Sequence, residues 1–224
     1  MSKRQAAFFD LDRTLIGVNS AFLYAQYERR NGRLSLLQFA RASFWMGLYH
    51  LSMVDMNRAF AEAVRQYEGA NSNTLQALTE DFFHREVVQT FQPGASEALD
   101  FHRANEHPLV LLTASSSYMS ELAMKEWEFD DYLANTFPTD ETGRLLGTFE
   151  RPMCYGAGKV HYAQRWAEEN EVDLQESYFY TDSFTDLPML EVVGHPVVIN
   201  PDPRLRRRAL REGWPVHDWS LVTS

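Results

Sequence analysis

Short apolar runs alternate along the chain with longer stretches in which apolar residues recur at helical spacing. Four runs of three or four residues each end at a small polar or acidic side chain: 6–9 before Asp10, 109–112 before Thr113, 178–180 before Thr181 and Asp182, and 197–199 before Asn200. Runs this short are typical of strands that are covered on both faces. Helical patterns follow at residues 96–105, 118–127, 159–170 and 186–193. The alternation predicts an α/β fold with a Rossmann-like, doubly wound parallel sheet, in which ligands bind beyond the carboxyl ends of the strands.

One longer segment interrupts this alternation after the first apolar run. Residues 17–92 contain helical patterns at 20–31, 35–51, 56–68 and 73–86, and the Pro93-Gly94 pair marks the return to the sheet. We therefore predict two units: an α/β core formed by residues 1–16 and 93–224, and an α-helical cap formed by residues 17–92. Because the cap is inserted directly after the first strand, we expect it to cover the active end of that strand.

Residues 34–54 are apolar enough to raise the question of a membrane span. Arg41 lies well inside the stretch, with Gln38 and His50 also within it, and a central arginine costs about 2.5–3.5 kcal/mol on insertion scales. Five apolar residues recur at helical spacing: Leu34, Leu37, Phe44, Leu48 and Leu51. A largely buried helix is the preferred interpretation, so no membrane span is predicted. A surface that meets a lipid or a partner is the alternative.

Composition and charge narrow the function classes. The 224 residues include 31 acidic and 21 basic side chains, a formal net charge of −10. This balance argues against general nucleic-acid binding, because phosphate backbones are held by surplus Lys and Arg. The basic run at residues 204–213 is interpreted as the solvated face of a helix, with a nucleic-acid patch as the alternative.

The cysteine count bears on the compartment. Cys154 is the one cysteine, which allows no intramolecular disulfide and favours a reducing environment. The apolar run near the N-terminus is too short for a signal peptide. A cytoplasmic location is therefore predicted, whereas no pattern in the sequence indicates an oligomeric state.

Two carboxylates follow the first run in the segment FFDLDRTLI. Side chains alternate along an extended strand, so Asp10 and Asp12 face the same side while Leu11 points away. Carboxylates this close do not titrate independently, and one pKa tends to rise. An ionised carboxylate is a nucleophile that needs no general base, and a protonated partner supplies the proton that a leaving alkoxide needs. The pair therefore predicts nucleophilic attack on a phosphate ester.

The other strand ends carry the charges that such a reaction requires. Mg²⁺ prefers oxygen ligands, typically one or two carboxylates with phosphate and water, and Asp10 and Asp182 are candidates for these ligands. Lys159 opens a helix after a glycine pair and adds a fixed positive charge, and the Thr113 hydroxyl can donate to a phosphate oxygen. Asp186 lies at the start of a helix, where its side chain is suited to orient the groups that bind the metal without binding the metal itself. Alignment and charge stabilisation are what phosphoryl transfer needs.

Four segments in order, FFDLDRTLI, LVLLTAS, GAGKV and YTDSFTDLPML, resemble the four motifs of the haloacid dehalogenase-like hydrolases. The resemblance is closest to the phosphoserine-phosphatase-like subgroup with a helical cap. It implies that Asp10 is phosphorylated and that Asp12 acts as the acid and base and offers its backbone carbonyl to Mg²⁺. It also implies that Thr113 and Lys159 hold the phosphoryl oxygens and that Asp182 binds Mg²⁺. Asp186 would orient Lys159 or the metal's waters, with Ser183 beside it.

Two residues depart from the pattern of this family. Arg13 replaces the glycine that is usual between the second aspartate and the threonine, and Asn19 stands where phosphoserine enzymes carry a glutamate for the substrate amino group. Both are candidates for substrate contact. The cap pattern is rich in large apolar residues, namely Phe39, Phe44, Trp45, Met46, Leu48 and Tyr49. A thick cap core is the preferred interpretation of these residues. If part of this surface lines the pocket, a bulkier ester such as histidinol phosphate is favoured over phosphoserine.

The function predicted from sequence is therefore a Mg²⁺-dependent phosphatase for small-molecule phosphate monoesters. A phosphotransferase would use the same intermediate and pass the phosphoryl group to an alcohol. A catalytically silent binding module is the other alternative, and the intact set Asp10, Asp12, Thr113, Lys159 and Asp182 argues against it.

Overall fold

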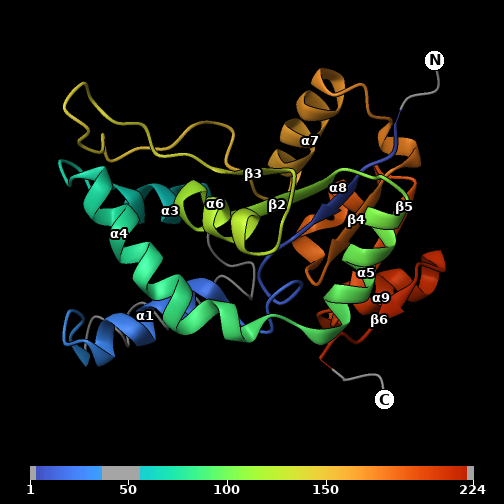
Figure 1. The fold of residues 1–224 in the computed structure, drawn as a ribbon, viewed down its shortest axis with the longest axis horizontal. Coiled ribbons are helices and arrows are strands. Elements are labelled where there is room, and N and C mark those ends of the chain that lie inside the picture. The colour runs from blue at the N-terminus through green and yellow to red at the C-terminus, as the bar shows by residue number, and fades with distance from the viewer. Residues whose placement is uncertain (1–3, 37–55, 221–224) are drawn as a thin grey trace.

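A six-stranded parallel sheet forms the centre of the molecule (Figure 1). The computed structural model describes residues 4–36 and 56–220, and the labels below are those of Figure 1. The strands lie in the order β3-β2-β1-β4-β5-β6. Their bounds are β1 Ala7–Phe9, β2 Leu109–Ser116, β3 Asp131–Asn135, β4 Tyr178–Thr181, β5 His195–Ile199 and β6 Val216–His217. The predicted parallel sheet is confirmed.

The strand order places a crevice beside β1. From β1 the chain builds outward through β2 to β3, and then returns to the other side of β1 to form β4, β5 and β6. Phe9 of β1 pairs with Leu111 of β2 on one side and with Tyr180 of β4 on the other. The reversal lies between β1 and β4, and in open α/β sheets the ligand site lies beyond the carboxyl ends of the strands at such a point. Asp10 and Asp182 follow directly after these two strands.

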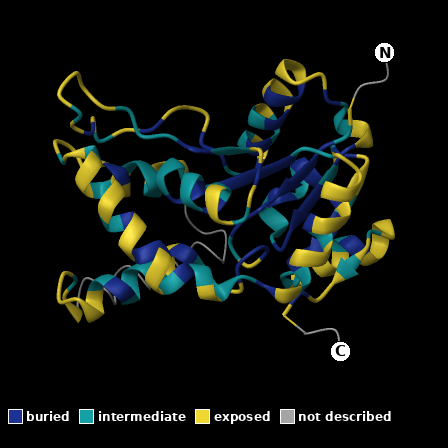
Figure 2. Ribbon diagram, viewed as in Figure 1, coloured by how far each residue is buried: buried dark blue, intermediate teal, exposed yellow. Residues whose placement is uncertain are grey.

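Helices cover both faces of the sheet, as the doubly wound prediction requires. One face packs against α5 Pro93–Ala104 and α6 Ser117–Glu126, and the other against α7 Ala157–Glu169, α8 Leu187–Leu190 and α9 Pro203–Glu212. Alternation along β1 sends Phe9 into the first layer and Phe8 into the second. Figure 2 shows the strands buried between helices whose outer sides are exposed. Burial of the strands on both faces explains why they read as unbroken apolar runs.

The helices that lie between β1 and α5 in the sequence form a group to one side of the sheet (Figure 1). It comprises α1 Ser20–Arg30, α3 Met56–Arg65 and α4 Ser72–Phe82, followed by the π-helical turn η1 Phe83–Val87 and the 3₁₀ turn η2 Val88–Thr90. Tyr27 of α1 and Phe82 of α4 belong to the same apolar cluster as Phe9 of β1. Helices α1 and α4 are therefore anchored to the sheet by continuous apolar packing.

Most of the predicted helix at residues 35–51 lies outside the described residues, as does most of the apolar stretch 34–54. Within residues 4–36 and 56–220, no helix combines the length and the apolar character that crossing a bilayer requires.

Several predicted boundaries were wrong. The strands β3 and β6, which are the two edges of the sheet, were missed: the apolar run of β3 is only three residues long, and β6 has only two residues. The strand β2 continues past Thr113 to Ser116. Pro93 begins α5 instead of preceding it, since a proline at the first helical position gives up no intrahelical hydrogen bond.

The helix predicted at residues 186–193 is also shorter than expected. The 3₁₀ turn η4 Phe184–Asp186 precedes α8, which ends at Leu190. The chain then packs so closely that a Cβ on Gly194 would lie 1.6 Å from the Gln175 carbonyl oxygen. This close approach fixes where the chain turns into β5.

A buried histidine packs behind the ends of β1 and β4. His102 of α5 is fully buried, with Nδ1 2.9 Å from His107 Nδ1 and Nε2 2.9 Å from the Tyr180 hydroxyl oxygen. Its ring meets Phe9 edge-on, and Phe9 stacks on Tyr180 with 4.4 Å between ring centroids. Since Phe9 precedes Asp10 and Tyr180 precedes Thr181, this cluster fixes the two strand ends relative to each other.

We expect this cluster to make the fold less stable as the pH falls. Burial, together with His107, lowers the pKa of His102 from 6.5 to about 4. Between these values the unfolded chain binds a proton that the folded chain does not. The contribution of His102 to stability is therefore full above pH 6.5 and falls by roughly 3 kcal/mol as the pH drops toward 4.

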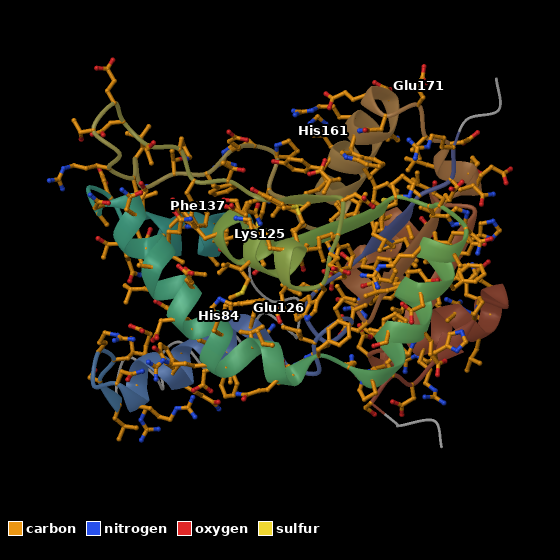
Figure 3. All side chains as sticks on the ribbon, in the orientation of Figure 1. His84, Lys125, Glu126, Phe137, His161 and Glu171 are labelled. Atoms are coloured by element: carbon orange, nitrogen blue, oxygen red, sulfur yellow. The ribbon has the colours of Figure 1, made fainter. Side chains whose placement is uncertain are left out.

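Urea unfolding across this pH range measures the effect. His102→Phe should flatten the pH dependence, whereas His161→Phe should keep it, because His161 is exposed and projects from the outer side of α7 (Figure 3). An unchanged slope in His102→Phe would show that other groups cause it.

Candidate active site

The ammonium group of Lys159 lies between two buried carboxylates at the β1/β4 crevice. Its Nζ donates to Asp10 Oδ1 at 2.8 Å and to Asp186 Oδ2 at 2.7 Å. The Lys159 side chain is only 2% exposed. Ions removed from water in this way are tolerated when they are paired and hydrogen-bonded. The structure thus brings three of the predicted site residues into direct contact.

Two glycines allow α7 to present Lys159 at this position. Gly156 caps the helix at φ 54° and ψ −124°, a conformation that L side chains rarely adopt. A Cβ on Gly158 would lie 1.8 Å from the backbone oxygen of Met153. The GAGK segment was singled out for its lysine, and the close packing at Gly158 is what lets that lysine enter the crevice.

Asp12 is held by the N-terminus of α1. Its Oδ1 accepts a hydrogen bond from the Ser20 backbone N–H at 3.1 Å, and its Oδ2 accepts one from Asn19 Nδ2 at 3.3 Å. The Asn19 side-chain oxygen also caps α1 by accepting from the Phe22 N–H at 2.9 Å. Asn19 therefore orients the carboxylate of Asp12 and starts the helix at the same time.

The loop between Asp12 and α1 contains a residue in the left-handed region. Arg13 is exposed and has φ 58°, a conformation that costs a non-glycine residue roughly 1–2 kcal/mol. Its N–H donates to the Val18 carbonyl at 3.1 Å, and its carbonyl accepts from Gln92 Nε2 at 3.1 Å. This backbone explains why glycine is usual at this position in the family that the motif resembles.

Gln92 ties this loop to a second strand end. The buried side chain donates from Nε2 to the Thr14 carbonyl at 2.7 Å, and its Oε1 accepts from Asn200 Nδ2 at 2.7 Å. Asn200 follows β5 and is itself left-handed, with φ 43°. The sequence prediction missed Gln92, because a lone glutamine before Pro-Gly carries no signal of what it contacts.

Asp186 and Asp182 both follow β4, but among the described residues only the Asp186 carboxylate accepts hydrogen bonds. The Asp186 carboxylate accepts from both Lys159 and the Thr181 hydroxyl, the latter at 2.7 Å. Asp182 is buried, yet no side chain or N–H among the described residues donates to its carboxylate. The Ser183 hydroxyl bonds to that of Thr185 at 2.8 Å. Thr181 was missed as a partner because its role depends on the turn that brings Asp186 back beneath it.

Thr113 lies inside β2, four residues beyond Leu109. It is buried, and its Oγ1 accepts from the Ser115 N–H at 3.2 Å. Asn135 at the end of β3 supports this region by donating from Nδ2 to the Ala114 carbonyl and accepting from the Cys154 N–H. Among the described residues, the Thr113 side chain makes no hydrogen bond to Lys159, Asp10 or Asp186.

The site carries more buried negative charge than positive charge. Burial raises the pKa of Asp10 to about 7, against the opposing ammonium of Lys159. Burial also raises the pKa of Asp12, and burial with the charge of Asp10 raises that of Asp182 well above its usual range. Burial disfavours the Lys159 ammonium, but its two carboxylate partners outweigh this and raise its pKa.

The donor set fits a hard divalent cation. Among the described residues the carboxylate of Asp182 has no hydrogen-bond donor, and the nearby charge of Asp10 helps to raise the pKa of Asp182. Oxygen donors of this kind suit Mg²⁺, which keeps several waters and takes one or two carboxylates. Among residues 4–36 and 56–220 no three His, Cys, Asp or Glu side chains form a metal-ligating group. A site with two carboxylates and a backbone carbonyl does not require a third such side chain.

A cavity of about 440 Å³ opens beside Asp12. Asn19, which caps α1, and Ser20, the first residue of α1, line it together with Ser115 and Ser116 from the end of β2. Residues of α3, α4 and α6 and the segment after β3 complete the described part of its wall. Arg13 is not among the described lining residues. The cavity is large enough for the body of a small organic ligand.

We expect Gly158→Ala to destabilise the fold and displace Lys159. The added methyl group overlaps the Met153 carbonyl, and such overpacking should lower the free energy of unfolding by at least about 2 kcal/mol. The control is Gly17→Ala, whose Cβ would meet its nearest neighbour at 3.7 Å. Urea unfolding of both variants provides the measurement, and equal stabilities would contradict the close packing of α7.

Sequence comparisons identify proteins that are similar to this chain. A family model described as haloacid dehalogenase-like hydrolase matches residues 7–191. An inhibition of morphological differentiation protein of Streptomyces azureus is 31% identical over 222 residues, covering 96% of this chain and 79% of that protein. A phosphoserine phosphatase of Mycobacterium tuberculosis is 28% identical over 226 residues, covering 97% and 71%. A histidinol-phosphatase of Neisseria meningitidis is 23% identical over 217 residues, covering 95% and 98%.

Solved structures of similar fold are also found. A Bordetella pertussis protein of unknown function superposes with a TM-score of 0.87 at 27% identity, covering 97% of this chain and 99% of that one. A phospho-aspartyl intermediate analogue of phosphoserine phosphatase superposes with a TM-score of 0.70 at 13% identity, covering 98% and 94%. The family model spans most of the chain, from β1 to the residue after α8. The chain belongs to the haloacid dehalogenase-like hydrolases.

Proposed function

We propose that this protein is a Mg²⁺-dependent phosphatase that hydrolyses small-molecule phosphate monoesters through a phospho-aspartate intermediate. The observation that carries the proposal is the Asp10–Lys159–Asp186 arrangement at the β1/β4 crevice, beside a cavity that Asp12 lines. Relatives named phosphoserine phosphatase and histidinol-phosphatase support the reaction class. The cytoplasmic location remains a prediction from the sequence.

Asp10 is the nucleophile in this proposal. Its carboxylate forms a bond to phosphorus while the bond from phosphorus to the ester oxygen breaks. Lys159, at 2.8 Å from Asp10 Oδ1, lowers the repulsion between the carboxylate and the anionic phosphoryl group. Asp186 holds Lys159 from the other side and so fixes its direction.

Asp12 moves the protons. Burial raises the pKa of Asp12, which favours the protonated form that gives a proton to the departing alkoxide. Water then attacks the phosphorus of the aspartyl phosphate, Asp12 takes a proton from that water, and Asp10 leaves as a carboxylate with release of phosphate. The bonds from Ser20 and Asn19 keep the Asp12 carboxylate aimed during both steps.

Mg²⁺ would be held by the carboxylates of Asp10 and Asp182 and by the backbone carbonyl of Asp12. When bound, it supplies positive charge to the phosphoryl oxygens. Thr113 would hold a phosphoryl oxygen with Lys159, and Ser183 would support Asp182 from the following turn. Residues 17–92 would form the cap over the core of residues 1–16 and 93–224, with Arg13 and Asn19 at the substrate entrance. The names of two relatives make phosphoserine and histidinol phosphate the first esters to assay.

We expect Asp10→Asn to abolish turnover without unfolding the protein, because the amide keeps the volume of the side chain and removes the nucleophile. The rate of free phosphate release from p-nitrophenyl phosphate should fall at least a hundredfold, or about 2.7 kcal/mol of barrier. Thermal melting of the variant serves as the control for folding. A smaller loss with an intact fold would exclude Asp10 as the nucleophile.

The same assay separates a phosphatase from a phosphotransferase. In the presence of an alcohol, a phosphatase releases one phosphate for each ester cleaved. A phosphotransferase instead yields phosphorylated alcohol in place of part of that phosphate. Wild-type release that falls short of ester consumption would favour the second function.

We expect activity to require a divalent cation with oxygen preference. Chelator should stop turnover and Mg²⁺ should restore it, and Asp182→Ala should raise the Mg²⁺ concentration needed for half-maximal rate at least tenfold, since one of two carboxylate ligands is lost. Asp173→Ala is the matched control, because Asp173 caps the turn η3 Leu174–Glu176 away from the crevice. Full turnover in excess chelator would rule out the metal.

A further inference from the structure

The described part of the wall of the cavity beside Asp12 is nearly free of charge. Of the twenty described residues that line it, Asp12 alone has an ionisable carboxylate or a cationic side chain. Seven of the twenty are aromatic. A pocket this poor in charge discriminates against ligands that carry charges, because each buried substrate charge would lose its water without gaining a partner.

The aromatic rings come from several elements and are held against one another. Tyr24 of α1 meets Phe82 of α4 edge-on with 5.1 Å between centroids. Phe137, in the segment after β3, lies 6.1 Å from the Phe60 ring of α3 and 6.2 Å from the Tyr118 ring of α6. Figure 3 shows Phe137 beside α3 and α6. The described wall is therefore assembled before a ligand arrives.

The carboxyl group of Asp12 is assigned to proton transfer in the proposed reaction, so it does not serve as a fixed negative charge for a substrate ammonium group. One of its oxygens accepts from the Ser20 N–H and the other from the Asn19 amide, and in the proposed reaction it must carry a proton. Asn19 is itself committed to Asp12 and to the cap of α1. No described lining residue remains that could neutralise an amino-acid head group.

We infer that the substrate is a phosphate monoester whose alcohol carries an uncharged apolar or aromatic body. The inference rests on the proposed phosphatase function and adds the class of leaving group. The phosphoryl group would lie at Asp10 and Lys159, and the body of the alcohol would lie in the cavity, next to the acid Asp12 that protonates its oxygen. Apolar contacts with the rings would replace the charged contacts that an amino-acid ester needs.

Primary alkyl phosphates test this with the leaving-group chemistry held nearly constant. The set is ethyl phosphate, 2-phenylethyl phosphate, phosphoethanolamine, phosphocholine and phosphoserine, each with Mg²⁺. We expect kcat/KM for 2-phenylethyl phosphate to exceed the value for every other ester by at least about tenfold, the discrimination typical of an apolar pocket. A preference for phosphoserine, phosphoethanolamine or phosphocholine would overturn the inference, the last by favouring an aromatic cage for a cation.

A charged variant of the wall provides the second arm. Ala59 lines the cavity from α3, so Ala59→Asp should lower the ratio of kcat/KM between 2-phenylethyl and ethyl phosphate at least fivefold. Ala77→Asp on the exposed side of α4 is the matched control and should leave that ratio unchanged. Equal ratios in the wild type and in Ala59→Asp would place the alcohol outside this cavity and overturn the inference.

Binding separates this inference from the proposed function. Calorimetry with 2-phenylethylphosphonate and ethylphosphonate, neither of which can be hydrolysed, should show at least tenfold tighter binding of the first. Equal binding together with hydrolysis of all esters contradicts the inference and leaves the phosphatase intact. Tighter binding without hydrolysis of any ester contradicts the phosphatase and leaves the apolar ligand class intact.

Discussion

The buried contact of Lys159 with Asp10 and Asp186 is the interaction on which the rest of the site depends. An ammonium group at 2% exposure is stable only while both carboxylates stay in place, and breaking such a group from one side typically costs about 3–5 kcal/mol. The three residues come from the end of β1, the first turn of α7 and the turn after β4. Each element is therefore held in register by the same charges that the proposed chemistry uses.

The loop after β1 shows what it takes to place two carboxylates so close together. The chain must reverse sharply after Asp12, and it does so through a left-handed residue, Arg13. Gln92 offsets this strain by bonding to the carbonyls of Arg13 and Thr14 while also holding Asn200. One buried glutamine thus joins two left-handed positions, at the ends of β1 and β5, and keeps the floor of the crevice rigid.

The sheet could be predicted because each inner strand is buried on both faces and so reads as an unbroken apolar run. The edge strands β3 and β6 are only partly buried, and β6 has only two residues, so they give a weaker signal in the sequence. The sequence could also predict that Asp10, Lys159 and Asp186 lie close together, because all three follow strands or start helices at one end of a parallel sheet. Thr181 and Gln92 could not, because their partners depend on backbone turns and on contacts between residues far apart in sequence, which spacing does not encode.

The structure accounts for both departures from the family pattern, Arg13 and Asn19. The structure explains Arg13 through its backbone, since the side chain is exposed and the unusual feature is φ. Asn19 is explained by its side chain, which orients Asp12 and caps α1. Neither role follows from the residue type alone, and both become visible only with the loop geometry.

The apolar character of the described wall links selectivity to catalysis. Burial is the main cause of the raised pKa of Asp12, and Asp12 shares the cavity with seven described aromatic residues. Exclusion of water also lowers the local dielectric constant, which strengthens the attraction between the Lys159 ammonium group and the carboxylates of Asp10 and Asp186. A cation in this wall would lower the pKa of Asp12, because its positive charge favours the carboxylate form. The apolar character of the described wall therefore favours an uncharged alcohol and also favours the protonated form of the proposed acid.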